Sequence, residues 1–114
     1  MESSVNSRLS SLRFRNLKLL RLIIEHGSVR KAADVLCVTQ PAASAMLQEV
    51  EQVLGIGLFI RSRSGMVPTP ALVSLVQRLT VIENEIQALG ADASAIQERL
   101  SSIDTDYAPS PLPH

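Results

Sequence analysis

The stretch GSVRKAADVLCVTQPAASAMLQEVEQVLG, residues 27–55, decides the fold. Ser28 and Thr39 are expected N-caps, because a hydroxyl oxygen accepts hydrogen bonds from the free amides of a helix's first turn. Gly27 and Gly55 are expected to end the helices that precede them. The stretch therefore predicts a helix from about Val29 to Leu36, a short connection, and a further helix that runs to about Leu54.

Both predicted helices have one apolar face at helical spacing. The small side chains of Ala32 and Ala33 allow the two helices to approach closely. Such a pair, joined by the three residues Cys37-Val38-Thr39, is a helix-turn-helix. The expected buried residues are Val29, Ala32, Ala33 and Leu36 on the first helix, and Ala43, Leu47, Val50 and Leu54 on the second.

The opposite face of the second helix is expected to point outward. Its side chains are Gln40, Ala42, Ser44, Ala45 and Gln48. Gln pairs well with adenine, Ser with several base edges, and the Ala methyl group with thymine, so this face suits the major groove of DNA. Ser28 and Thr39, at helix N-termini, are placed to hold phosphates.

The neighbouring segments complete a small domain. Apolar residues cover most of the circumference of residues 14–26, which predicts a buried helix. Residues 57–61 and 66–67 are strand-like and flank the turn Ser62-Arg63-Ser64-Gly65, so we expect a hairpin, or wing. Arg61 and Arg63 on this wing are expected to contact phosphate or the minor groove.

A long helix is expected from Ala71 to Ile103. Its apolar residues alternate in steps of three and four, which is the spacing of a coiled-coil seam. A narrow seam on an otherwise polar helix needs a partner helix, so we expect dimerisation. The expected contacts are Leu75, Leu79, Ile82, Ile86, Leu89, Ala93, Ile96 and Leu100.

Composition excludes several other classes of protein. The chain of 114 residues has 46% apolar residues and a net charge of zero, but its basic residues gather in the first 70 positions. The lone Cys37, expected to be a small buried residue, excludes an internal disulfide and a multi-cysteine zinc site. No apolar run is long enough to cross a bilayer, and the start lacks the features of a signal peptide. We expect an intracellular protein with no catalytic residues, no metal site and no cofactor.

Residues 12–71 resemble the N-terminal DNA-binding domain of LysR-type transcriptional regulators. The resemblance rests on Gly27-Ser28 with Ala32-Ala33, on Val38-Thr39-Gln40-Pro41-Ala42, and on Leu58-Phe59 followed by Arg61. It implies a mainly helical protein, with a winged helix-turn-helix and a long linker helix that dimerises. It also implies a C-terminal effector-binding domain, which is expected to be absent from this chain together with its small-molecule effector.

The sequence departs from the family in the recognition helix. Ala45 stands where the family often has Arg or Lys, and Met46 stands where Gln is common. Readout is therefore expected to depend on the remaining polar and methyl-bearing side chains, or on DNA shape. The expected DNA-binding residues are Ser28, Arg30, Lys31, Thr39, Gln40, Pro41, Ala42, Ser44, Ala45, Gln48, Arg61, Arg63 and Ser64.

The predicted organisation has four parts. They are a flexible start (1–12), a winged helix-turn-helix (13–70), a linker and dimerisation helix (71–103) and a disordered tail (104–114). The expected partner is double-stranded operator DNA, bound by a homodimer or higher oligomer in the bacterial cytoplasm, at the nucleoid. The alternative is a winged helix that binds another protein.

Overall fold

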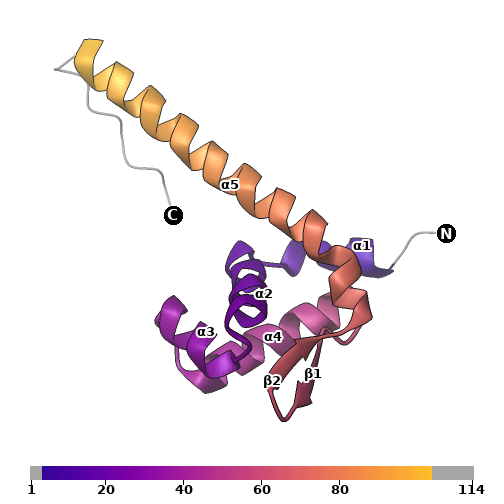
Figure 1. The fold of residues 1–114 in the computed structure, drawn as a ribbon. Helices are drawn as coiled ribbons and strands as arrows, with labels where there is room; N and C mark the ends of the chain where they lie inside the picture. Colours follow the sequence, from indigo (N-terminus) through magenta and orange to yellow (C-terminus); the bar gives the residue numbers. More distant parts are fainter. Residues whose placement is uncertain (1–3, 104–114) are drawn as a thin grey trace. The chain divides into compact units, whose positions relative to one another are not determined.

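The structure, a computed structural model, describes residues 4–103. It divides into two compact units, residues 1–83 and 84–114. The elements are α1 (Ser4–Arg8), the 3₁₀ turn η1 (Leu9–Ser11), α2 (Phe14–His26), α3 (Val29–Leu36), α4 (Gln40–Leu54), β1 (Phe59–Ser62), β2 (Gly65–Pro68) and α5 (Pro70–Ile103) (Figure 1). The predicted class is confirmed: a mainly helical chain with a winged helix-turn-helix followed by a long helix.

The expected caps define the helix-turn-helix. The Ser28 hydroxyl oxygen accepts from the Lys31 amide, and the Thr39 hydroxyl oxygen accepts from the Ala42 amide, both at 3.2 Å. Gly27 and Gly55 adopt left-handed backbone angles, with φ of 68° and 74°, and end α2 and α4. The predicted bounds of α3 and α4 are therefore confirmed.

Helix α2 lies at the centre of the first unit. Leu19, Leu20 and Ile23 on this helix have no exposed surface. They pack in one apolar cluster with residues of α3, α4, the segment before β1 and the first turn of α5, including Ala32, Val50, Leu58 and Leu72. The prediction that residues 14–26 form a buried helix is confirmed.

The expected buried face of α4 is wrong at one position. Ala43, Leu47 and Val50 are buried as predicted, but the fourth buried residue is Val53, whereas Leu54 is half-buried. The N-terminal segment, α1 and η1, packs against α4. The guanidinium Nε of Arg8 in this segment donates to the Val53 carbonyl oxygen at 3.1 Å.

The expectation of a loose start through residue 12 is wrong for residues 4–11, which form α1 and η1. The segment is too short and too rich in serine to carry a helical pattern of its own. Its stabilisation comes from tertiary contacts, which a local reading of the sequence does not contain.

The expectation that Cys37 is buried is also wrong. Cys37 is exposed and adopts a left-handed conformation, with φ of 60°, at the end of α3. The Cys37 amide donates to the Asp34 carbonyl oxygen at 3.1 Å. The Val38 amide donates to the Ala33 carbonyl oxygen at 3.0 Å. The residue therefore ends α3 as glycine usually does, and the chain turns there so that Val38, rather than the thiol, packs against the core.

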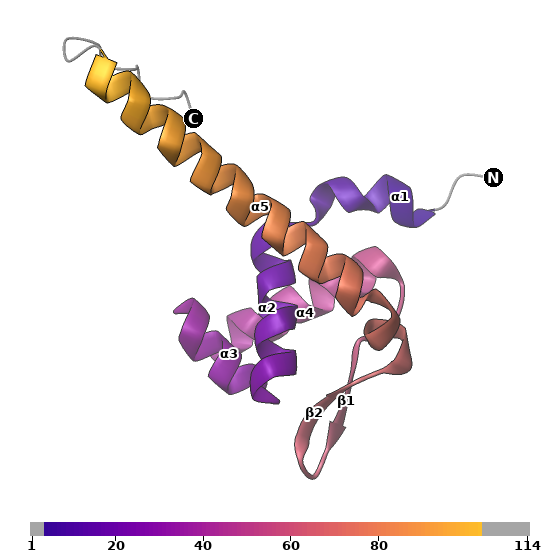
Figure 2. The ribbon, with the colours of Figure 1, turned by 45° about the horizontal axis from the view of Figure 1, so that its top comes forward.

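Strands β1 and β2 form the wing. They pair antiparallel from Phe59 opposite Pro68 to Ser62 opposite Gly65, and Arg63 and Ser64 make the loop between them. Figure 2 shows the two strands side by side as a hairpin that projects from the helices of the first unit.

Helix α5 begins one residue earlier than expected, at Pro70. The Thr69 hydroxyl oxygen accepts from the Leu72 amide at 3.2 Å and so caps this helix. The winged helix-turn-helix was expected to end at residue 70, but the first compact unit continues to Glu83. It does so because Leu72 on α5 is buried and Leu79 packs against the core. The first turns of α5 thus belong to the winged unit.

The described part of the second unit, residues 84–103, is the rest of α5. All its side chains from residue 84 to residue 102 are exposed. The predicted helix to Ile103 is confirmed. The expected disordered tail, residues 104–114, lies outside the described residues.

Candidate nucleic-acid interface

One face of α4 is open to solvent. The predicted readout residues Gln40, Pro41, Ala42, Ser44, Ala45 and Gln48 are all exposed. The opposite face, with Ala43, Leu47 and Val50, is buried in the core. Packing therefore determines which side of α4 points outward, and that side carries short polar or methyl-bearing side chains.

The wing is anchored beside this face by its backbone. The Met66 amide donates to the Gly27 carbonyl oxygen at 3.0 Å. Gly65 has a φ of 116°, and a Cβ on it would overlap that same oxygen. Glycine is required here both for its backbone angle and for the close approach.

A small hollow of about 150 Å³ forms where the wing meets the helix-turn-helix. Ser28 and Arg30 from the start of α3, Gln40 from the start of α4, and Arg61 from β1 line it. The structure thus brings together four predicted DNA-binding residues from three elements, α3 with its cap, α4 and β1. Two helix N-termini, a hydroxyl and two guanidinium groups suit a phosphate.

The other predicted residues do not line this hollow. Gln48 lies further along α4 and lines a separate hollow with Gln52 and Gly55. Arg63 occupies the wing loop, and Lys31 is exposed on α3. The candidate interface therefore extends from the wing loop along α4.

The Ser62 and Ser64 side chains bond within the wing loop. Their hydroxyl oxygens lie 3.0 Å apart, and the Ser62 oxygen lies 3.0 Å from the Gly65 carbonyl oxygen and 3.3 Å from the Ser64 amide. Ser62, which the sequence analysis did not single out, therefore shapes the loop that carries Arg63.

The candidate interface carries basic side chains that form no ion pairs with acidic residues among residues 4–103. Within residues 4–103 the ion pairs are those of Arg21 with Glu25 and with Glu83. Arg30, Lys31, Arg61 and Arg63 accordingly have no acidic partner in this range, and all four are exposed. Free cations beside an exposed helix are what a polyanion needs.

Two buried polar contacts were missed by the sequence analysis. The Asn16 amide nitrogen donates to the Met46 carbonyl oxygen at 3.2 Å and to Glu49 Oε1 at 2.9 Å, which ties α2 to α4. Arg21 Nε donates to Glu83 Oε2 at 2.7 Å, which ties α2 to α5. Both contacts join residues at least 30 positions apart, so neither has a local signal.

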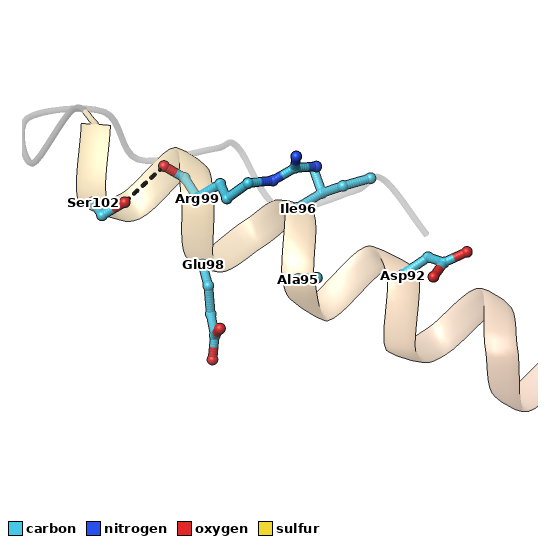
Figure 3. A pocket seen from close by; sticks show the side chains of 6 residues that line it. All are labelled: Asp92, Ala95, Ile96, Glu98, Arg99 and Ser102. Atoms are coloured by element: carbon cyan, nitrogen blue, oxygen red, sulfur yellow. Dashed lines mark hydrogen bonds between the residues drawn. The ribbon is translucent and has the colours of Figure 1, made fainter.

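The described part of the second unit, residues 84–103, carries only shallow hollows on the surface of α5. A hollow there is lined by residues of α5 alone, and Figure 3 shows Arg99 extended along the helix over Ile96 while Glu98 points to the opposite side. The Ser102 hydroxyl donates to the Arg99 carbonyl oxygen at 3.0 Å, a bond within the helix. This arrangement pairs no nucleophile with a base.

Among residues 4–103, no three His, Cys, Asp or Glu side chains are grouped so as to hold a metal ion. Nor does any helix in this range have the length and apolar character needed to cross a membrane.

Known proteins are similar to most of the chain. The model of the family described as bacterial regulatory helix-turn-helix protein, lysR family, matches residues 14–71. The HTH-type transcriptional regulator CbbR of Rhizobium meliloti (strain 1021) is 33% identical over 78% of this chain and 28% of its own length. The small neutral protease regulatory protein of Streptomyces coelicolor is 38% identical over 71% of this chain and 26% of its own length.

Solved structures agree. A crystal structure of a BenM DBD complex with benA site 1 DNA has a TM-score of 0.68, with 30% identity over 75% of this chain and 96% of that one. A CbnR DBD–DNA complex has a TM-score of 0.67, with 29% identity over 75% of this chain and 98% of that one. The chain spans less than a third of the length of the curated relatives that it matches, and these relatives are regulators rather than enzymes. The chain belongs to the LysR family of bacterial regulatory helix-turn-helix proteins, and residues 14–71 form its helix-turn-helix domain.

Proposed function

We propose that this chain binds operator DNA in a sequence-specific manner as a homodimer, and that it is the DNA-binding and dimerisation part of a LysR-type transcriptional regulator. The observation that carries the proposal is the exposed face of α4, flanked by the hollow of Ser28, Arg30, Gln40 and Arg61. Its relatives include domains crystallised with DNA. From this partner we also infer that the chain acts at the nucleoid of the bacterial cytoplasm.

In this proposal α4 enters the major groove. Gln40, Ser44 and Gln48 donate to and accept from base edges, while Pro41, Ala42 and Ala45 make apolar contacts. Ser28 and Thr39 use their hydroxyl oxygens as caps, and each hydroxyl still carries a proton to donate to a phosphate oxygen.

The basic residues position the domain. Arg30 and Lys31 on α3 and Arg61 on β1 contact phosphates, and Arg63 in the wing loop reaches the minor groove. Ser64 supports this loop through its bonds to Ser62.

Dimerisation uses the seam of α5. Leu75 and Leu79 are half-buried in the winged unit, which leaves Ile82, Ile86, Leu89, Ala93, Ile96 and Leu100 exposed and available to a second copy. The exposed fractions of Ile86 and Leu89 are 39% and 66%, large for such apolar side chains on one helix. Two-fold symmetry then requires an operator built as an interrupted inverted repeat.

The experiment is a selection from a pool of random duplexes, followed by sequencing. We expect enrichment of an interrupted inverted repeat. A pool that stays random after repeated rounds at low salt would contradict DNA recognition, and would favour a winged helix that binds protein. Enrichment of a single half-site would contradict the dimer alone.

A further inference from the structure

Glu83 is a buried acid on a helix with a continuous apolar seam. Its side chain is 6% exposed, and Glu83 and Asn16 are the buried polar residues among residues 5–102. The Glu83 carboxylate on α5 accepts a hydrogen bond at 2.7 Å from Nε of Arg21, which lies in the middle of α2. Arg21 is held in turn by Glu25, whose Oε2 lies 2.9 Å from Arg21 Nη1.

A gain in the stability of the fold is a weak explanation for the buried contact between Arg21 and Glu83. Burial of a carboxylate removes its hydration, and an apolar side chain in such a place is often as stable or more so. A charge-assisted hydrogen bond adds direction: it fixes the distance and the rotation of the two helices against each other. The pair therefore suits a positioning role.

The position of Glu83 on α5 indicates what it positions. Before it, Leu72, Leu75 and Leu79 are buried or half-buried in the winged unit. After it, every described side chain from residue 84 to residue 102 is exposed. The contact with Arg21 is thus the last anchor of α5 on the winged unit, directly before the exposed seam.

We propose that Arg21 and Glu83 are positioning residues that determine which spacing between operator half-sites the dimer accepts. The pair fixes the first part of α5, residues 70–83, against α2. In a dimer held by α5, this attachment becomes a restriction on the separation of the two recognition helices. The inference rests on the proposed function, because it needs a dimer that binds DNA.

The test uses the full 114-residue chain and the half-site obtained from the selection. Inverted repeats are made with spacers that lengthen by one base pair at a time over a full turn of the duplex. Affinity is measured for each repeat and for a single half-site. The variants are Glu83→Leu, which restores an apolar side chain, Glu83→Gln, which removes only the charge, and Arg21→Met, which keeps the apolar stem.

We expect the unaltered chain to bind one spacing more tightly than the others. In the three variants, the ratio of the affinity for that spacing to the affinity for the others is expected to fall about fivefold or more. Affinity for the single half-site is expected to stay unchanged, which separates positioning from damage to the winged unit. The matched control Glu85→Leu, an exposed acid two residues further along α5, is expected to keep the original profile.

Two outcomes would overturn the inference. The spacing profile of Glu83→Leu could match that of the unaltered chain, or affinity could fall equally for the half-site and for every spacing. Failure of the proposed function is distinct from both, because the unaltered chain would then select no duplex.

Discussion

Gly65 in the wing lies against the carbonyl oxygen of Gly27, the residue that ends α2. The neighbouring Met66 amide donates to that oxygen at 3.0 Å, and a Cβ on Gly65 would overlap it. Gly27 directly precedes Ser28, the cap of α3, so the contact fixes the wing to the start of the helix-turn-helix. The hollow of Ser28, Arg30, Gln40 and Arg61 depends on this attachment.

Gly65→Ala is therefore expected to destabilise the winged unit by about 1–3 kcal/mol, because the new Cβ meets backbone and the φ of 116° is strained for alanine. Thermal unfolding measures the effect. Gly57→Ala is the matched control, since its Cβ would meet nothing within 4 Å and its backbone angle is ordinary. Equal unfolding temperatures for the two variants would show that the wing is not anchored at Gly27.

Arg63→Ala tests the wing loop. Arg63 in the minor groove displaces counterions from the duplex, so its loss is expected to lower the slope of log affinity against log salt by about 1. Arg78→Ala, which removes an exposed arginine from α5, is the control and is expected to leave the slope unchanged. An unchanged slope for Arg63→Ala would place the wing loop away from DNA.

Gln40→Ala and Ser44→Ala test direct readout by α4. If Gln40 pairs with a base, its loss is expected to cost about 1–3 kcal/mol of discrimination between the selected repeat and a scrambled duplex. Gln52→Ala changes an exposed residue near the end of α4 and serves as the control. If neither Gln40→Ala nor Ser44→Ala alters discrimination, readout through these side chains is wrong.

Ile86→Asp combined with Leu89→Asp tests the seam. Burial of each side chain contributes about 1.5–3 kcal/mol, and a symmetric dimer loses each one twice, so a monomer is expected in sedimentation equilibrium. Leu79 is unsuitable for this test because it packs against the core of the winged unit. The control is Gln87→Asp with Ala88→Asp, which adds the same charge beside the seam. If both double variants dimerise with the same dissociation constant, the seam does not form the dimer interface.

Helix ends were predictable because their signals are local. Ser28 and Thr39 cap with their own side chains, and Gly27 and Gly55 supply left-handed backbone angles, so a few adjacent residues determine each boundary. The exposed face of α4 followed from the spacing of its buried residues.

Contacts between distant segments were not predictable in the same way. Arg21 and Glu83 are 62 positions apart, and nothing near either residue indicates the other. The hydrogen bond from Arg8 to the Val53 carbonyl oxygen joins α4 to an N-terminal segment whose helix has no pattern of its own. The prediction that Cys37 is buried was wrong because this residue adopts a left-handed conformation, which is usual only for glycine and asparagine at the end of a helix.

The most direct test of the central claim is the fluorescence anisotropy of two labelled duplexes, the selected inverted repeat and a scrambled version, titrated at several salt concentrations. We predict tight binding that favours the repeat, with an affinity that falls steeply as salt rises, because phosphate contacts release counterions and base contacts discriminate. A flat salt response, with no binding to either duplex at low salt, would contradict the account.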